Sequence, residues 1–154
     1  MQVVRLCSHR SDPAWSPLDG VGASITGGRW NSPGKRVAYT ASCGALAMLE
    51  YLVHSSTTPK NLILSIVVIP DSLDIERSHW APVDLAASRQ IGDEWIARAE
   101  CPVLEVPSVL APRQKNYLIN PLHPLFKAIK ITDRNPFAFD SRLISFSSTS
   151  VPTP

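Results

Sequence analysis

A chain of 154 residues fits one compact domain, because chains usually divide into domains only beyond roughly 250 residues. Its hydrophobic share of 44% and charged share of 18% support a packed core and exclude a chain that is disordered throughout. Fifteen basic and thirteen acidic side chains leave a formal net charge of +2 at pH 7, which is too small for the basic stripe of a nucleic-acid-binding protein.

The first third of the sequence predicts two strands, a long loop and a helix. Residues 3–7 have strand composition, and the prolines, glycines and aspartates of residues 8–26 suit an ordered loop. After a Pro-Gly turn signal, residues 37–40 predict a second strand. Ser42 is a good N-cap, so we expect a helix at residues 45–54.

Glu50 has an unusual place in this helix. Leu46, Leu49 and Val53 recur at spacings of three and four, which predicts that this stripe faces the core. Glu50 lies beside the stripe and not opposite it. A carboxylate there either reaches outward to solvent or a neighbouring amide, or forms part of a cleft wall where it stabilises positive charge on a sugar carbon.

The rest of the sequence predicts three strands and one more helix. Residues 61–69 form an almost continuous apolar run, which indicates a central strand buried on both faces, and residues 88–99 have helical spacing. Residues 103–109 and 127–132 have strand composition, and the prolines of residues 112–124 favour a structured loop. We therefore expect one α+β domain at residues 1–144, with a mixed β-sheet core and few helices, and a flexible tail at residues 145–154.

Nothing in the sequence indicates export, a membrane span or a metal. The first residues lack the apolar core of a signal peptide, and the longest apolar stretch is broken by Ser65. Cys7, Cys43 and Cys101 are odd in number and widely separated, and no histidine lies at a metal-ligand spacing. We expect a cytoplasmic protein with free thiols, no metal and no prosthetic group.

The densest concentration of unusual residues begins at Gly27. Gly27 and Gly28 let the backbone approach a ligand and their amides can point at anionic oxygens, while Arg29 adds a forked cation suited to phosphate. An ordinary turn with a surface arginine explains the same tripeptide. Tyr39 follows on the second strand, where a core aromatic with a hydrogen-bonded hydroxyl is the simpler interpretation.

Two polar residues downstream are harder to interpret. Ser108 lacks the Gly-x-Ser-x-Gly surroundings of a hydrolase nucleophile. Asn120 begins a rigid, polar segment that can line a pocket, although turn chemistry explains it equally well.

Several separated segments, in one order, resemble the RES domain, a family named after its arginine, glutamate and serine. They are residues 27–31 (Gly-Gly-Arg-Trp-Asn), 34, 37, 39–40, 45, 47 and 49–50, and downstream residues 91–95, 106–108, 116–124 and 139–143. The resemblance covers nearly the whole chain. It implies the toxin of a bacterial toxin–antitoxin pair, with a fold similar to that of ADP-ribosyltransferases and with NAD⁺ as substrate.

The resemblance also implies the site. Arg29, Glu50 and Ser108 match the residues that name the family, and Arg29, Tyr39 and Glu50 are the expected catalytic residues. The expected NAD⁺-binding residues are Arg5, Gly27, Gly28, Arg29, Trp30, Asn31, Tyr39, Ser108 and Asn120.

Breaking the nicotinamide–ribose bond neutralises the leaving group while the ribose gains oxocarbenium character. We expect Arg29 and the amides of Gly27 and Gly28 to bind the pyrophosphate and Tyr39 to stack on nicotinamide. Glu50 is expected to stabilise the cation or hold the ribose hydroxyls, and Ser108 to orient nicotinamide or ribose.

The expected function is a toxin that consumes NAD⁺ by hydrolysis or phosphorolysis, depletes it and arrests growth. One alternative is a mono-ADP-ribosyltransferase that modifies a host protein. Others are a non-catalytic binding domain and a ribonuclease-type toxin that uses His54 or His123, against which the weak charge argues. The resemblance implies a cognate antitoxin, an Xre-type helix-turn-helix protein that blocks the active site. The oligomeric state, monomer or homo-oligomer, stays open.

Overall fold

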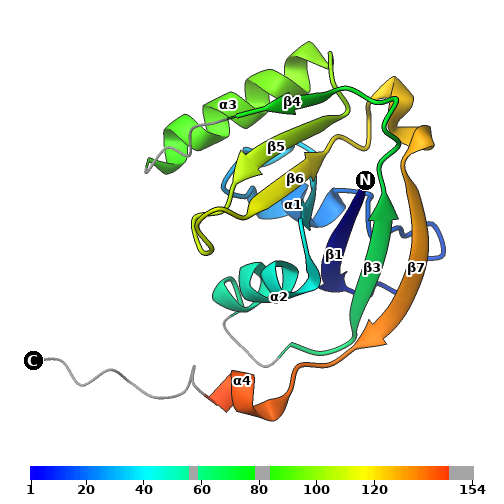
Figure 1. Ribbon diagram of the computed structural model, residues 1–154, viewed down its shortest axis with the longest axis vertical. Helices are drawn as coiled ribbons and strands as arrows, with labels where there is room; N and C mark the ends of the chain where they lie inside the picture. Colours follow the sequence, from blue (N-terminus) through cyan, green and yellow to red (C-terminus); the bar gives the residue numbers. More distant parts are fainter. Residues whose placement is uncertain (56–58, 79–83, 146–154) are drawn as a thin grey trace, which may run out of the picture.

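The computed structural model describes residues 1–55, 59–78 and 84–145 (Figure 1). Its core is one seven-stranded mixed sheet with the strand order β4-β5-β6-β2-β1-β3-β7. The pair β4–β5 is parallel and the other neighbouring pairs are antiparallel. The expected α+β class with a mixed sheet is therefore confirmed.

The described elements follow one another along the chain as β1 (Gln2–Ser8), α1 (Val21–Thr26), β2 (Ala38–Ala41), α2 (Gly44–Val53), β3 (Leu62–Val68), β4 (Ile75–Arg77), α3 (Leu85–Arg98), β5 (Val103–Pro107), β6 (Lys115–Ile119), the 3₁₀ helix η1 (Pro124–Ala128), β7 (Lys130–Phe137) and α4 (Ser141–Ser145). The predicted strands at the start of the chain and at residues 61–69 are both present, as are the two predicted longer helices.

The sheet is weakly joined between β1 and β2. Strand β1 pairs with β3 along its whole length, from Gln2 opposite Val68 to Ser8 opposite Leu62. By contrast, β1 and β2 share a single register pair, Val4 opposite Ala41. Figure 1 shows the consequence, because β1, β3 and β7 run together on one side while β4, β5 and β6 take a different direction on the other.

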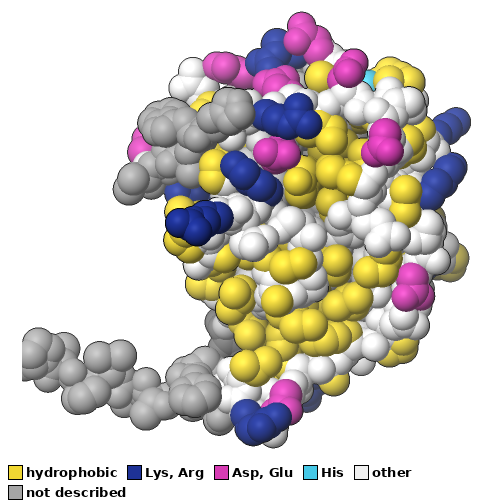
Figure 2. Space-filling view, viewed as in Figure 1, with side chains coloured by type: hydrophobic (Ala, Val, Ile, Leu, Met, Phe, Trp, Pro, Cys, Tyr) yellow, Lys and Arg dark blue, Asp and Glu magenta, His cyan; other side chains and the backbone are white. Residues whose placement is uncertain are grey.

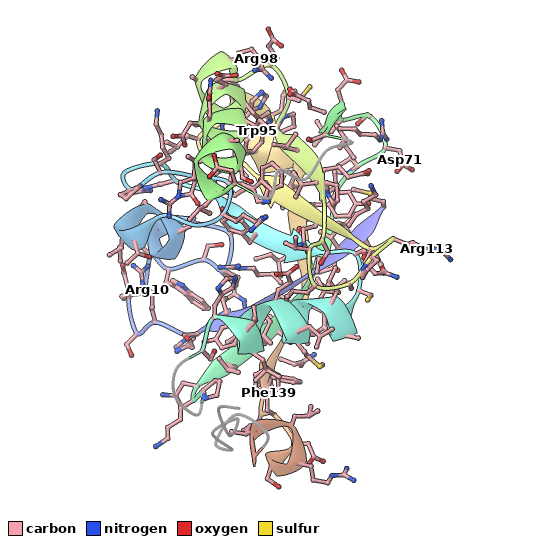
Figure 3. All side chains as sticks on the ribbon, turned by 90° about the vertical axis from the view of Figure 1, so that its left-hand side faces the viewer. Arg10, Asp71, Trp95, Arg98, Arg113 and Phe139 are labelled. Carbon is pink, nitrogen blue, oxygen red and sulfur yellow. The ribbon has the colours of Figure 1, made fainter. Side chains whose placement is uncertain are left out.

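Helices α2 and α3 cover the same face of this sheet at different places. Leu46 of α2 packs against β1 and β2 in a cluster that includes Ala41. Trp95 of α3 packs against β5 and β6 in a cluster that includes Leu118. Tyr39 lies opposite Leu118 and two positions from Ala41, so all three share one face. The middle of that face, on β2 and β6, therefore lies between α2 and α3 (Figure 3).

Three expected features of the chain are wrong. Residues 115–119 form β6 and not a loop, because the prolines of this region lie outside the strand and leave its amides able to pair with β2 and β5. The expected loop at residues 8–26 ends in the short helix α1. The last expected strand, at residues 127–132, begins only at Lys130 and extends to Phe137, and η1 occupies residues 124–128.

Helix α2 also differs from its expected start and orientation. Cys43 is its N-cap, while the hydroxyl of Ser42 donates to Gln114. Leu46 is buried as expected, but Leu49 is 49% exposed and Val53 is 56% exposed. The helix is apolar on almost every side, so spacing alone selects the wrong face. Apolar side chains consequently gather over the lower half of the molecule, around α2 (Figure 2).

The outer strands and the end of the chain complete the fold. Strand β3 lies beside the edge strand β7, so it is internal but not central, and its side chains are buried only in part. Ser145 ends α4, and the rest of the tail expected at residues 145–154 lies outside the described residues. In the described part of the chain, no helix is long and apolar enough to cross a membrane.

Candidate active site

Two side chains distant in the sequence, those of Ser108 and Asn116, meet at the carboxylate of Glu50 on α2. The hydroxyl of Ser108, just after β5, donates to Oε1 of Glu50 over 2.9 Å. The amide nitrogen Nδ2 of Asn116, on β6, donates to the same oxygen over 2.6 Å. Within the described residues, Oε2 of Glu50 receives no hydrogen bond. One carboxylate oxygen is thus fixed by two neutral donors, and the other is left for a ligand.

The sheet register explains why these residues meet. Asn116 lies opposite Val106 on one side and Ala41 on the other, on the face that carries Tyr39. Helix α2 begins directly after β2, so Glu50 stands above the same strands. Glu50 and Ser108, which the sequence analysis assigns to the same site, therefore lie in contact. Asn116 was not among the expected site residues, and its signal in the sequence was its place at the start of the resembling segment 116–124.

Ser108 has no free hydroxyl proton for a substrate. Its single proton goes to Glu50, and its oxygen accepts from the amides of Leu110 and Ala111 over 3.2 Å each. The side chain is only 7% exposed. In this arrangement Ser108 positions Glu50, and the expectation that it bonds directly to nicotinamide or ribose is not supported.

The hydroxyl of Tyr39 is likewise already hydrogen-bonded within the protein. It donates to Oδ1 of Asn31 over 2.7 Å and accepts from the amide of Trp30 over 3.0 Å. Burial raises the pKa of this hydroxyl well above its ordinary value, with the amide of Trp30 acting in the opposite direction. The Tyr39 hydroxyl therefore stays protonated at neutral pH, and because it is already hydrogen-bonded on both sides, the ring is the part of this side chain available to a substrate.

Gly28 is required by close packing and not by amide donation to an anion. A Cβ on Gly28 would lie 2.5 Å from the Tyr39 hydroxyl and 2.8 Å from Oδ1 of Asn31. The amide of Gly27 donates to Ala23, and the amide of Gly28 donates to the carbonyl of Asn31. The expectation that these two amides bind a phosphate is thus wrong for this conformation, because both already have acceptors.

Asn31 and Trp30 are structural. Asn31 is fully buried, and its amide donates to the carbonyls of Ala23, Ser32 and Lys35. The Trp30 side chain is 3% exposed and packs with Trp95 in the core. Both residues shape the segment that carries Arg29, which is half-buried.

Helix α3 holds this segment from the other side. Nε of Arg89 donates to the carbonyl of Gly28 over 2.9 Å, and the carboxylate of Asp93 accepts from the amide of Ser32 over 3.0 Å. Gly92 lies directly against the carbonyl of Trp30, where no side chain would fit. Sequence reasoning missed Arg89, because it lies outside the segments that resemble the family.

Two further expected ligands do not join this cluster. Arg5 projects from β1 between Val4 and Leu6, which both pack with α2, so its side chain lies on the other side of the strand. It donates to the carbonyls of Pro17 and Tyr39 and so braces the first loop against β2.

Asn120 is 2% exposed and accepts from the amide of Leu122. It lies four residues along the chain from Asn116, about 13 Å at the usual rise of an extended strand.

The histidines support no ribonuclease site. The ring of His123 is 6% exposed, its Nδ1 accepts from the amide of Leu125, and its Nε2 therefore donates to the carbonyl of Ala99. His54 is the C-cap residue that follows α2, and it is exposed. Among the described residues, no group of three or more histidine, cysteine, aspartate or glutamate side chains could hold a metal ion.

Comparison with known proteins identifies relatives of this chain. The chain is 39% identical over 139 residues to the "Prs ADP-ribosylating toxin" of Sphingobium sp. (strain YBL2), covering 82% of this chain and 86% of that one. It is 37% identical over 143 residues to "Toxin Res" of Photorhabdus laumondii subsp. laumondii, covering 86% and 90%.

A solved structure shares the fold. It is the crystal structure of the M. tuberculosis MbcT–MbcA toxin–antitoxin complex, with a TM-score of 0.68 at 17% identity, and the match covers 89% of this chain and 84% of that one. Residues 2–140 match the family described as the RES domain. The chain therefore belongs to the family of RES domain toxins.

Proposed function

We propose that this chain cleaves the nicotinamide–ribose bond of NAD⁺. The observation that carries the proposal is the carboxylate of Glu50, with Oε1 held by Ser108 and Asn116 and with Oε2 unengaged among the described residues. Cleavage turns the positively charged nicotinamide into a neutral leaving group and places positive charge on the ribose. A carboxylate held beside the anomeric carbon interacts more strongly with this positive charge in the transition state than with NAD⁺ in the ground state. It therefore lowers the barrier to cleavage.

Each residue has a separate task in this scheme. Oε2 of Glu50 faces the ribose, where it stabilises the oxocarbenium ion or accepts from a ribose hydroxyl. Ser108 and Asn116 touch Glu50 and not the substrate, so they are positioning residues. The ring of Tyr39 stacks on nicotinamide, since its hydroxyl is already bonded. Arg29 binds the pyrophosphate through its planar fork.

The acceptor decides which product forms. Attack by water gives ADP-ribose and a proton, and attack by inorganic phosphate gives ADP-ribose 1″-phosphate. In either case NAD⁺ is consumed at each turnover, which depletes the cofactor and arrests growth.

A second candidate is transfer of ADP-ribose to a protein side chain, with the same bond broken. The relative named an ADP-ribosylating toxin, at 39% identity, specifically favours this candidate.

The proposal includes a partner. A chain that consumes NAD⁺ must be silenced in its own cell, and the structural neighbour was solved as a toxin–antitoxin complex. We propose a cognate antitoxin of the Xre-type helix-turn-helix class, which covers the face between α2 and α3 and so blocks Glu50. This function places the protein in the cytoplasm, where NAD⁺ is present.

Product identification tests the proposal. The purified chain is incubated with NAD⁺ labelled in the adenosine moiety, without phosphate, with phosphate, and with a cytoplasmic protein extract. Free nicotinamide in all three samples is expected, with label in ADP-ribose, its 1″-phosphate or protein according to the acceptor. Intact NAD⁺ in all three samples overturns the proposal. A Glu100→Gln variant is the matched control, because Glu100 is an exposed surface carboxylate that pairs with Arg98.

A further inference from the structure

Arg89 is a half-buried cation whose orientation is fixed by the backbone of the candidate site. Its Nε donates to the carbonyl of Gly28 over 2.9 Å. A guanidinium group is planar, so this one bond sets the direction of the two terminal nitrogens as well. Ordering such a long side chain costs conformational entropy, and the fixed fork is then prepared for a ligand.

The terminal nitrogens of Arg89 have no partner within the described part of the chain. They form no hydrogen bond there, and no carboxylate lies within ion-pair distance of the guanidinium. By contrast, Arg98, nine residues further along α3, bonds Glu76 over 2.6 Å. A half-buried guanidinium that keeps its charge uncompensated is unusual, because burial of an unpaired charge is costly.

The surroundings of Arg89 are open to solvent and close to the residues already assigned to NAD⁺. Arg89 lines a surface groove together with Ser32 and the carboxylates of Asp84, Asp93 and Glu94. Asp84 accepts from the first amides of α3, and Glu94 accepts from the side chain of Gln90. Oδ1 of Asp93 accepts from the amide of Ser32. The charge of Arg89 also acts on the hydroxyl of Tyr39. The carbonyl that orients Arg89 belongs to Gly28, the residue before Arg29.

We propose that the terminal nitrogens of Arg89 bind the pyrophosphate of the dinucleotide, so that Arg29 and Arg89 hold it from either side of Gly28. This inference rests on the proposed function for the identity of the ligand. Two arginines match the two negative charges of a pyrophosphate diester, whereas one arginine leaves a charge unpaired. Arg89 is thus a substrate-binding residue contributed by α3, an element from which the sequence predicts no ligand.

The substitution Arg89→Gln separates binding from support of the loop. The amide nitrogen of glutamine occupies the place of the arginine Nε, so the donor to Gly28 is kept while both terminal nitrogens and the charge are removed. Arg89→Leu removes both functions. Arg98→Gln is the matched control, because it removes a guanidinium from the same helix without touching Gly28.

Two measurements are made on each variant. The first is binding of ADP-ribose and of nicotinamide by calorimetry, which needs no turnover. Arg89→Gln is expected to weaken ADP-ribose binding about tenfold to a hundredfold, the usual effect of losing hydrogen bonds to a charged group, and to leave nicotinamide binding and the melting temperature unchanged. The second is NAD⁺ cleavage, where KM is expected to rise by the same factor with kcat nearly constant.

Two results overturn the inference. They are unchanged ADP-ribose binding in Arg89→Gln and an equal weakening of ADP-ribose and nicotinamide binding. The proposed function fails separately. If the wild-type chain binds ADP-ribose through Arg89 but leaves NAD⁺ intact with every acceptor, the binding site stands and the cleavage reaction is wrong.

Discussion

The hydroxyl of Ser108 donates to Oε1 of Glu50 over 2.9 Å, although the two residues are 58 positions apart in the chain. The same serine oxygen accepts from two backbone amides of the following turn. Ser108 therefore ties the Glu50 carboxylate on α2 to the backbone of the connection between β5 and β6. The serine that helps to name the family acts here as a support for the glutamate.

Ser108 and Asn116 are expected to act through Glu50 and not independently. Ser108→Ala and Asn116→Ala should each lower kcat for NAD⁺ cleavage about tenfold, because each removes one donor to a charged carboxylate, with KM nearly unchanged. In a Glu50→Gln background the same substitutions should cause no further loss. Steady-state kinetics on the double-mutant cycles measure this coupling.

Ser42→Ala serves as the control for these variants, since it removes a serine hydroxyl that bonds Gln114 and not Glu50. It should leave kcat unchanged. If the losses in kcat simply add to that of Glu50→Gln, Ser108 and Asn116 act on the substrate directly and their assignment as positioning residues is wrong.

Alanine substitutions at Gly28 and Gly22 are compared to test the packing of the candidate site. Gly28→Ala should destabilise the fold by about 1–3 kcal/mol, because the added methyl group meets the Tyr39 hydroxyl. Gly22→Ala, in α1, should stabilise it by about 0.5–1 kcal/mol, since nothing lies within 4 Å of the new Cβ and alanine favours a helix. Chemical denaturation gives both values. A Gly28→Ala variant with the same unfolding free energy as wild type would contradict the packing described.

Tyr39→Phe is expected to separate stability from activity. It removes a buried hydroxyl that bonds Trp30 and Asn31, so it should cost about 1–3 kcal/mol of unfolding free energy. The ring remains, so NAD⁺ cleavage by the folded variant should stay within a few-fold of wild type. Loss of cleavage in a folded Tyr39→Phe protein would show that the hydroxyl takes part in the reaction.

The same hydroxyl predicts a pH dependence of stability. Its pKa is raised on folding, so the unfolded chain loses this proton first as the pH rises. The contribution of Tyr39 to stability is therefore fully present below the ordinary tyrosine pKa of about 10 and is lost progressively above it. Unfolding free energies measured from pH 8 upward should fall less steeply for Tyr39→Phe than for wild type, and identical slopes would contradict the assignment.

Composition and periodicity predict the parts of the fold that are locally distinctive. The apolar run at residues 61–69 and the strand composition of residues 3–7 correspond to β3 and β1. Helix α3 begins at Leu85, three residues before its expected start, because Asp84 caps it. The position of helix α2 is predicted correctly but its buried face is not. Because the helix is apolar on nearly all sides, its sequence does not show which side faces the core.

The candidate site is predictable only in part. The resemblance identifies Arg29, Glu50 and Ser108, but not how they act. The role of Asn116 depends on β6, and the prolines around that strand favour a loop in the sequence. Without the register of β6 against β2 and β5, nothing places Asn116 beside Glu50. The sequence does not predict the role of Arg89 for a similar reason, because its contact with Gly28 joins residues 61 positions apart.

The most direct test of the account is the rate of nicotinamide release from NAD⁺ by wild type, Glu50→Gln and Glu100→Gln under identical conditions. Glu50→Gln should lose a factor of about a hundred to a thousand in rate while keeping the wild-type melting temperature, because it removes the charge that stabilises the transition state and little packing. Glu100→Gln should match wild type. Nicotinamide release at the wild-type rate by a folded Glu50→Gln protein would contradict the central claim.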